Sequence, residues 1–280
     1  MKTLLVKLLF ALLFHEIARL LFQRNKTTII YYHDIEPELF DKHLYYLKRK
    51  YNIVSLEDYV KKRIEKTVNH RLIITFDDGH VGNFELHKIL EKHQVPCTIF
   101  LVSNVINSHK HFWFKWHKID SESKDKLKKI PNQQRLEVLK TQYDFDENQD
   151  HPTAQALNLE QIQVMKRWVS FQSHTHTHPC LNRCNDQESL FEIAHSKRKI
   201  EALTKQDVFA LCYPNGDYES RDTENAKRLG YQCVLTSHGY FNSKEFDEFE
   251  LKRLSVNDFS SVKELAMRTS GVYKWMKKIM

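Results

Sequence analysis

Residues 71–79 read RLIITFDDG, and the rest of the chain is interpreted outward from this stretch. Residues 72–76 are aliphatic, β-branched or aromatic, the kind of run that a buried strand needs. The run ends in two adjacent carboxylates, Asp77 and Asp78, which repel one another unless a divalent cation offsets their charge. One carboxylate would then remain free to accept a proton. The stretch predicts a strand with chemistry at its carboxyl end; a solvated turn is the alternative.

A second polar stretch, SHTHTHPCL at residues 173–181, contains three closely spaced histidines. One helical turn would bring His174 and His178 together and direct His176 elsewhere, whereas a strand would put all three on one face. Pro179 disfavours helical geometry at His178, so we expect a single turn that ends there. Two imidazoles and a carboxylate from another strand end would make a three-ligand metal site with open positions for water. A merely histidine-rich loop is the alternative, in a chain with 16 histidines.

Strand-like and helix-like segments alternate through much of the chain. The expected strands are residues 27–32, 72–76, 97–102, 208–213, 231–236 and 251–256, and the expected helices are residues 38–50, 84–93, 186–203 and 219–229. This alternation predicts an α/β fold with a parallel sheet and right-handed crossovers. Reactive side chains then gather at the carboxyl ends of the strands, where Asp77 and Asp78 are expected.

The motifs TFDDG at residues 75–79 and HTHTH at residues 174–178 resemble the first two motifs of the polysaccharide deacetylases with NodB homology, carbohydrate esterase family 4. The resemblance covers residues 27–256 and implies a distorted (β/α) barrel. It implies that Asp77 is the general base and that the metal ligands are Asp78, His174 and His178. Zinc fits two imidazoles and a carboxylate best, and cobalt, nickel or iron are alternatives for a mixed nitrogen and oxygen site.

The third motif of the family usually reads Arg-x-Pro-aromatic, and here residues 212–215 read CYPN. The arginine that orients the base in the family is therefore missing, because Cys212 stands in its place. Arg253, in the expected strand at residues 251–256, is a candidate substitute. The residue after the proline donates its main-chain N–H to the developing oxyanion in the family, so the resemblance gives this role to Asn215.

The general acid of the family is a histidine in a late strand that ends in hydrophobic-x-His-Asp, and no segment after residue 216 has this form. Residues 29–34, IIYYHD, match it near the start of the chain. The first and last strands of a closed barrel are neighbours. A histidine at the end of the first strand can therefore occupy the same position in space as one at the end of a late strand. The chain thus resembles the circularly permuted deacetylases that act on poly-N-acetylglucosamine. His33 is the predicted acid, with Asp34 as the partner that orients its ring, and His238 is the alternative acid.

Residues 1–24 are hydrophobic but are interrupted by polar residues, and no small-residue cleavage site of a secretory signal follows. Lys7, Ala11, His15 and Arg19 are four apart and line one face of a helix, with Leu, Phe and Ile around the rest. This predicts a membrane-associating helix that lies in the interface, at the cytoplasmic face. An uncleaved signal-anchor facing outward and a helix packed on the barrel are the alternatives.

We expect one deacetylase domain at residues 27–258, with a basic helix at residues 259–280 and a helical insertion at about residues 104–166. The insertion is rich in aromatic residues and lysines and either packs on the barrel or covers the substrate. The hydrophobic content of 41% suffices for a sizeable core. The formal net charge of +7 is dispersed among 36 acidic residues, and no nucleic-acid partner is expected.

The five cysteines are odd in number, which favours buried free thiols in a reducing compartment over a disulfide framework. A structural zinc site that uses Cys180 and Cys184 is the alternative.

The motifs together predict a metal-dependent hydrolase that removes N-acetyl groups from amino sugars of a polysaccharide or a lipid-linked glycan. One alternative is an amidohydrolase that uses the same site on a small amide or a peptidoglycan sugar. Another is a basic, non-catalytic zinc-containing binding module, against which the paired carboxylates at a strand end argue.

Overall fold

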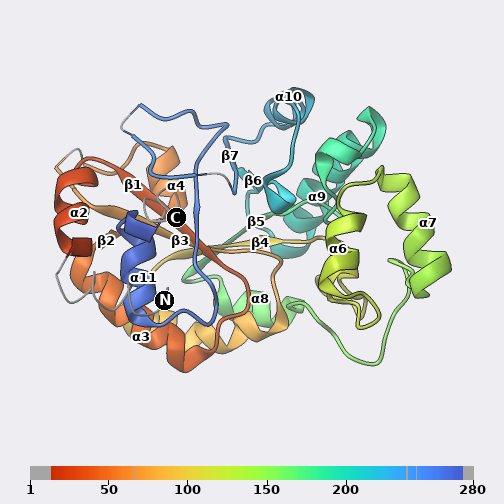
Figure 1. Ribbon diagram of the computed structural model, residues 1–280, viewed down its shortest axis with the longest axis horizontal. Coiled ribbons are helices and arrows are strands. Elements are labelled where there is room, and N and C mark those ends of the chain that lie inside the picture. The colour runs from red at the N-terminus through yellow and green to blue at the C-terminus, as the bar shows by residue number, and fades with distance from the viewer. Residues whose placement is uncertain (1–13, 66, 238, 244, 274–280) are drawn as a thin grey trace.

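The computed structural model describes residues 14–273 except 66, 238 and 244 (Figure 1). Most of the predicted N-terminal helix, the alternative acid His238 and the last residues of the predicted C-terminal helix therefore lie outside the described residues. Among the helices of the described part, none is both long enough and apolar enough to cross a membrane.

A parallel sheet forms the centre of the molecule (Figure 1). Within the described residues its strands lie in the order β7-β6-β5-β4-β3-β1-β8, and a short strand, β2, also pairs with β3. The strands are β1 (Thr27–Tyr32), β2 (Asn52–Ile53), β3 (Arg71–Phe76), β4 (Cys97–Leu101), β5 (Val169–Ser173), β6 (Ala210–Cys212), β7 (Cys233–Leu235) and β8 (Leu254–Ser255).

Strands β1 and β3 pair with one another and are almost fully buried, as their β-branched and aromatic sequences require. Their register pairs Tyr32 with Phe76, so the next residue of each strand, His33 and Asp77, emerges at the same edge. The amide of Asp77 continues the ladder and donates to the carbonyl of Tyr32 at 2.9 Å. Two residues from distant sequence motifs are thereby brought side by side.

The segment around residues 248–255 closes the sheet into a distorted barrel. Leu251 forms a parallel bridge with Leu235 at the end of β7, and then Leu254 and Ser255 pair with Ile30 and Tyr31 of β1. One segment thus contacts both the last and the first long strand of the chain. The predicted distorted (β/α) barrel of the NodB type is confirmed, as is the prediction that its first and last strands are neighbours.

Helices surround the barrel (Figure 1). They are α2 (Phe14–Phe22), α3 (Pro37–Lys50), α4 (Leu56–Val60), α5 (His87–His93), α8 (Leu159–Met165), α9 (Asp186–Thr204), α10 (Ser220–Arg228) and α11 (Val262–Thr269). Helix α4 is capped by Ser55, whose side chain accepts a hydrogen bond from the amide of Asp58. Helix α11 packs against α3 and β8 and buries Leu265 in the main core.

The insertion between β4 and β5 carries α6 (Ser121–Leu127) and α7 (Asn132–Tyr143) and lies on the right in Figure 1, far from α2. It has a small core of its own, formed by Trp113, Ile119, Leu127, Leu139 and Phe145. The indole N–H of Trp113 donates to the carbonyl of His178 at 3.0 Å. The insertion is therefore a packed platform that is tied directly to the histidine loop.

Candidate active site

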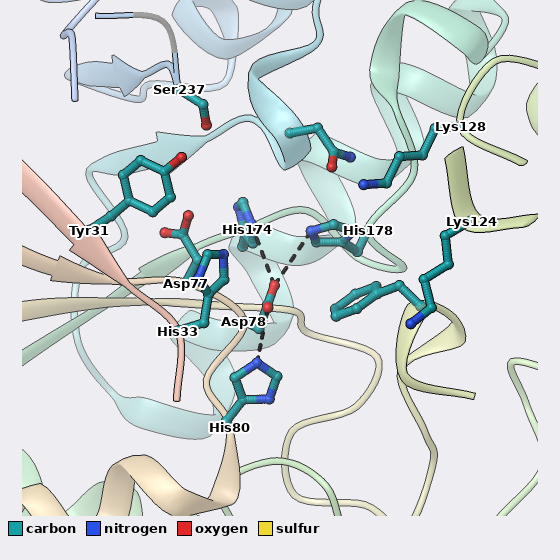
Figure 2. Close-up of a pocket in the computed structure, with 12 residues that line it drawn as sticks. Tyr31, His33, Asp77, Asp78, His80, Lys124, Lys128, His174, His178 and Ser237 are labelled. Carbon is teal, nitrogen blue, oxygen red and sulfur yellow. Dashed lines mark ion pairs between the residues drawn. The ribbon is translucent and has the colours of Figure 1, made fainter. Parts of the chain in front are cut away.

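A cavity of about 480 Å³ opens at the carboxyl ends of the central strands (Figure 2). All three predicted catalytic residues and all three predicted metal ligands line it. The lining residues are Tyr31, His33, Asp77, Asp78, His80, Phe114, Lys124, Lys128, His174, His178, Asn215 and Ser237.

Asp78, His174 and His178 form a buried cluster that could hold a metal ion. Oδ1 of Asp78 lies 3.6 Å from Nε2 of His174 and 3.4 Å from Nε2 of His178 (Figure 2). Ligand bonds of about 2.0–2.2 Å to one shared ion leave ligand atoms roughly 3–3.5 Å apart in a tetrahedral site. The separations therefore fit a small divalent cation between the three side chains.

The hydrogen bonds around this cluster leave its ligand atoms free. Nδ1 of His174 lies 2.8 Å from the carbonyl of Cys212, which can only accept, so Nδ1 carries a proton and Nε2 is the nitrogen that can bind a metal. Burial lowers the pKa of His178 to about 3, so its imidazole is neutral near pH 7. Oδ1 of Asp78 is buried and has no hydrogen-bond partner among the described residues. An unpaired buried carboxylate oxygen that faces Nε2 of two imidazoles fits a cation.

His80 orients the other oxygen of Asp78. Its Nε2 lies 3.1 Å from Oδ2 of Asp78, and its Nδ1 lies 3.2 Å from the ammonium group of Lys115. The ammonium group can only donate, so Nδ1 accepts and Nε2 donates to the carboxylate. Burial would raise the pKa of Asp78, but this hydrogen bond helps to hold it well below its usual range.

The histidine loop is not the helical turn that the spacing predicts. Thr175 and His178 both have left-handed backbones, with φ of 65° and 61°, and the segment between them is a bend. Glu192 of α9 fixes the bend, because its buried carboxylate accepts the amides of His176 and Thr177, each at 2.8 Å. These bonds replace the hydrogen bonds that a helical turn would make. The predicted outcome still holds, since His174 and His178 converge while His176 turns to the hydroxyl of Ser103 at 2.8 Å.

Asp77 faces Arg253, which pairs with it through two parallel hydrogen bonds. Nη1 and Nη2 of Arg253 donate to the two carboxylate oxygens at 2.7 and 2.8 Å, and the guanidinium also lies over the ring of Tyr31. Burial alone would raise the pKa of Asp77, but the charge of Arg253 holds it below its usual range. The carboxylate is therefore ionised at neutral pH.

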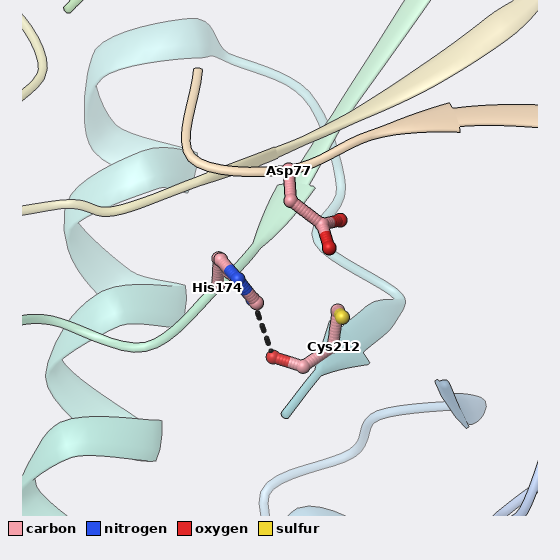
Figure 3. Close-up of side chains that lie close together, drawn as sticks. All are labelled: Asp77, His174 and Cys212. Atoms are coloured by element: carbon pink, nitrogen blue, oxygen red, sulfur yellow. Dashed lines mark hydrogen bonds between the residues drawn. The ribbon is translucent and has the colours of Figure 1, made fainter. Parts of the chain in front are cut away.

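A second group of side chains, Asp77, His174 and Cys212, is also close enough to hold a cation (Figure 3). Arg253 already occupies this position, because it binds both oxygens of Asp77 and donates to the sulfur of Cys212 at 2.8 Å. A cation there would meet a guanidinium, so the structure favours the cluster around Asp78.

None of the five cysteines, all of which the structure describes, forms a disulfide, and all are buried, as the sequence predicts. The groups of described residues that could hold a metal include neither Cys180 nor Cys184, so the structure gives the alternative zinc site no support.

His33 lies in the cavity near Asp77, but Asp34 is not its partner. The carboxylate near His33 belongs to Asp258, whose Oδ2 lies 3.9 Å from Nδ1, and which also accepts the main-chain amides of His33 and Asp34. Asp34 turns away and pairs with Lys115 at 3.3 Å. The structure thus places Asp258, and not the predicted Asp34, beside the ring of His33, because the chain bends after β1 and directs Asp34 to Lys115.

Asn215 lies in a turn at the rim of the cavity, with a left-handed φ of 56°. The turn is fixed by Gly216, where a Cβ would come within 2.8 Å of the amide nitrogen of Ser237. The amide side chain of Asn215 points to the sulfur of Cys180 at 3.4 Å.

Several cavity residues were not predicted from the sequence: His80, Phe114, Lys124, Lys128 and Ser237. His80 is two residues after Asp78, so its proximity to the metal cluster was a usable signal. The lysines lie in a charged helix that reads like any solvated surface, and only the packing of the insertion brings them to the cavity.

Residues 64–234 match the sequence profile of the family described as polysaccharide deacetylase. YxkH of Bacillus subtilis, which carries the same family name, is 25% identical over 198 residues, 70% of this chain and 54% of that protein. This chain thus spans about half the length of that relative.

Solved structures of deacetylases share the fold. PplD of Streptococcus pyogenes has a TM-score of 0.65 at 21% identity, over 88% of this chain and 99% of that chain. IcaB of Ammonifex degensii has a TM-score of 0.65 at 16% identity, over 89% of this chain and 98% of that chain. With a profile match over more than half of its residues, this chain belongs to the polysaccharide deacetylase family.

Proposed function

We propose that the protein is a divalent-metal-dependent N-deacetylase of amino sugars in a glycan. The observation that carries the proposal is the division between two adjacent carboxylates in one cavity. Asp77 is ionised and held by Arg253, and Asp78 faces two imidazoles with an unpaired oxygen. A base next to a metal-binding carboxylate is what amide hydrolysis by water needs.

The metal would be held by Asp78, His174 and His178, with zinc as the first choice by ligand type and cobalt, nickel or iron as alternatives. A divalent metal supplies Lewis acidity, which polarises an amide carbonyl and lowers the pKa of water.

The other residues divide the proton transfers between them. Asp77 accepts the proton of the attacking water, and Arg253 keeps its carboxylate ionised and correctly turned. His33 lies near Asp77, beyond the end of the neighbouring strand, and donates a proton to the departing amine. Asp258 lies beside the ring of His33, with its Oδ2 3.9 Å from Nδ1. The main-chain N–H of Asn215 is the proposed donor to the developing oxyanion.

We also propose that the protein binds a membrane surface through α2. Ile17, Leu20, Leu21 and Phe22 are 51% to 70% exposed, while the polar residues of the same helix face the barrel. Arg19 donates to the carbonyl of Lys50, and Lys50 forms an ion pair with Glu16 at 2.6 Å. A helix whose apolar side chains point outward is suited to an interface. The buried free thiols support the cytoplasmic face.

The position of α2 favours a polysaccharide over a lipid-linked sugar. Helix α2 immediately precedes β1, and the cavity lies beyond the other end of that strand. In Figure 1, α2 and the insertion helix α6, which contributes to the cavity, lie at opposite sides of the molecule. A surface that binds α2 would leave the cavity open to the aqueous phase.

Acetate release from N-acetylated oligosaccharides, with and without a chelator, tests the proposed function. We expect metal-dependent release of one acetate per new amine. Release from small amides but from none of the glycans would point to the alternative amidohydrolase. Absence of any release from metal-loaded protein would contradict the proposal.

Vesicle sedimentation tests the membrane proposal separately. The full chain should bind vesicles, and a chain without residues 1–22 should remain in solution with unchanged activity, because the cavity residues all follow β1 or lie within it. Equal sedimentation of both chains would contradict it, and resistance to alkaline extraction would indicate a spanning anchor.

A further inference from the structure

We propose that Lys124 and Lys128 select a glycan that carries a negative charge close to the N-acetylated sugar, as a carboxylate or a phosphate ester. This inference rests on the proposed deacetylase function and names the class of its substrate. The two lysines come from the insertion, outside the motifs that supply the base, the acid and the metal ligands.

Both lysines belong to the wall of the catalytic cavity. Lys124 lies within α6 and Lys128 caps its carboxyl end, and both side chains are half-buried. Figure 2 shows them on the side of the cavity that lies across His178 from Tyr31 and His33. A sugar with its N-acetyl group at the metal cluster would therefore extend toward them in one direction.

Neither ammonium group is neutralised by the described part of the protein. No ion pair or hydrogen bond between the described residues includes the side chain of Lys124 or Lys128, in contrast to Lys126, which pairs with Glu122 at 2.7 Å. The acidic residues of the cavity are engaged elsewhere, Asp77 by Arg253 and Asp78 by imidazoles. Like charges four residues apart also destabilise a helix. Two uncompensated cations in a cavity favour an anionic ligand.

The insertion holds these charges at a fixed place. Leu127, between the two lysines, is buried in the core of the insertion together with Trp113. Trp113 is hydrogen-bonded to the carbonyl of His178, so α6 and the metal cluster share one rigid support. Charges that are positioned before binding cost little ordering entropy when the ligand arrives.

Phe114 lines the same cavity as the two lysines and the metal cluster. Its ring lies 4.5 Å from the ring of His178. An apolar ring face beside two ammonium groups suits a sugar ring with an anionic substituent. Lysine binds carboxylates and phosphates as a point charge, so both substituents share the chemistry that the cavity would recognise.

The test compares three matched N-acetylated oligosaccharides, one neutral, one with a carboxylate and one with a phosphate ester. Acetate release is measured for the metal-loaded wild type, the double variant Lys124→Gln/Lys128→Gln, and the control Lys126→Gln. The double variant should raise KM for the charged substrates by roughly ten-fold or more and leave the neutral substrate unchanged, since charged hydrogen bonds are lost. Lys126→Gln should change nothing, because its ammonium group faces a glutamate on the exposed side of α6.

The two charged substrates separate the sources of the negative charge, since the one with the larger change in KM identifies the group. Equal KM values for neutral and charged substrates in the wild type, or an equal change for all three in the double variant, would overturn the inference and leave the deacetylase function intact. If no substrate releases acetate, the proposed function fails instead. Calorimetric binding of the same oligosaccharides to the metal-loaded wild type and the double variant then decides the inference, with loss of charge-dependent binding as the supporting result.

Discussion

Asp77 and Asp78 follow one another in the chain and are equally buried, each 3% exposed, but their carboxylates meet opposite surroundings. Both oxygens of Asp77 are bound by one guanidinium. Asp78 meets three imidazoles, and one of its oxygens has no hydrogen bond within the described residues. The first arrangement holds a fixed charge that can take up a proton, and the second leaves one carboxylate oxygen available to a cation. Burial alone therefore does not assign a role; the partners do.

The backbone creates this difference within one residue. Asp77 still belongs to the ladder of β3 and donates its amide to Tyr32, whereas Asp78 has a left-handed φ of 71°. Gly79 is also left-handed, at 75°, and a side chain there would collide with Leu101. A left-handed conformation at a residue other than glycine costs of order 1–3 kcal/mol and persists where the surroundings enforce it. The turn thus directs two adjacent carboxylates to different partners.

The largest expected effect comes from removing the metal-binding half of the pair. Asp78→Ala should lose bound metal and turnover together, since two imidazoles alone leave the site one ligand short. Elemental analysis and acetate release on the same preparation measure both. His174→Ala and His178→Ala should behave in the same way, and metal retained at full stoichiometry in His174→Ala would refute the ligand assignment.

Asp77→Asn should separate the two roles. The amide keeps the shape of the side chain and cannot accept the proton, so turnover should fall by about three to four orders of magnitude while metal content stays unchanged. Loss of metal in this variant would mean that Asp77 is itself a ligand, as the group with His174 and Cys212 would allow. The contrast between the two carboxylates would then break down.

His33→Ala should lower turnover by roughly two to four orders of magnitude without changing metal content. It should also remove the alkaline limb of the pH–rate profile, because the proposed acid must be protonated to act. Asp34→Asn is the matched control and should lower turnover far less, since its carboxylate turns away from His33 to Lys115. Near-full activity of His33→Ala, with loss in His238→Ala, would contradict the permuted assignment.

The surroundings of His33 show what a sequence can and cannot predict. The strand before it, the strand before Asp77 and their pairing follow from local patterns and from barrel closure, and the structure has them as expected. The partner Asp258 lies 225 residues from His33 in the chain, and no local pattern connects them. The sequence indicates Asp34 because it follows His33 in the motif IIYYHD, whereas Asp258 belongs to no recognisable motif.

The same limit explains the remaining differences. The spacing of His174 and His178 predicts that their side chains converge. It does not predict the backbone conformation of the loop between them, which depends on hydrogen bonds to Glu192 of a later helix. The sequence does not decide the role of the insertion, since lysines on a charged helix face a cavity or water depending on tertiary packing. Arg253 was a candidate only because the family's arginine is missing; its two hydrogen bonds to Asp77 appear only when the barrel closes.

Arg253→Lys should sharpen the comparison through pH. The charge of Arg253 counteracts the effect of burial and lowers the pKa of Asp77, so weakening the pair lets that pKa rise. As pH falls, Asp77 would become protonated earlier, and the acid limb of the pH–rate profile should move to higher pH. Turnover near pH 7 should fall roughly ten-fold, because a lysine cannot make both hydrogen bonds.

Cys212→Ala provides the control for this shift. It removes the sulfur contact of Arg253 and leaves both hydrogen bonds to Asp77, so its acid limb should stay in place. An acid limb that moves in Cys212→Ala as much as in Arg253→Lys would mean that the pair with Arg253 does not set the ionisation of Asp77.

The smallest effect is expected at the histidine between the two ligands. The ring of His176 leaves the cavity, bonds to Ser103 and lies against His195 at 4.4 Å, so His176→Ala removes contacts that neither carboxylate uses. Glu192 holds the bend through the main-chain amide of residue 176, which alanine retains. Metal content should therefore be unchanged, and turnover should fall by no more than about three-fold, as for a substitution outside the site. Loss of activity in His176→Ala with full activity in His178→Ala would show that His176, and not His178, binds the metal. Asp78 would then lose one of the imidazole partners that distinguish it from Asp77.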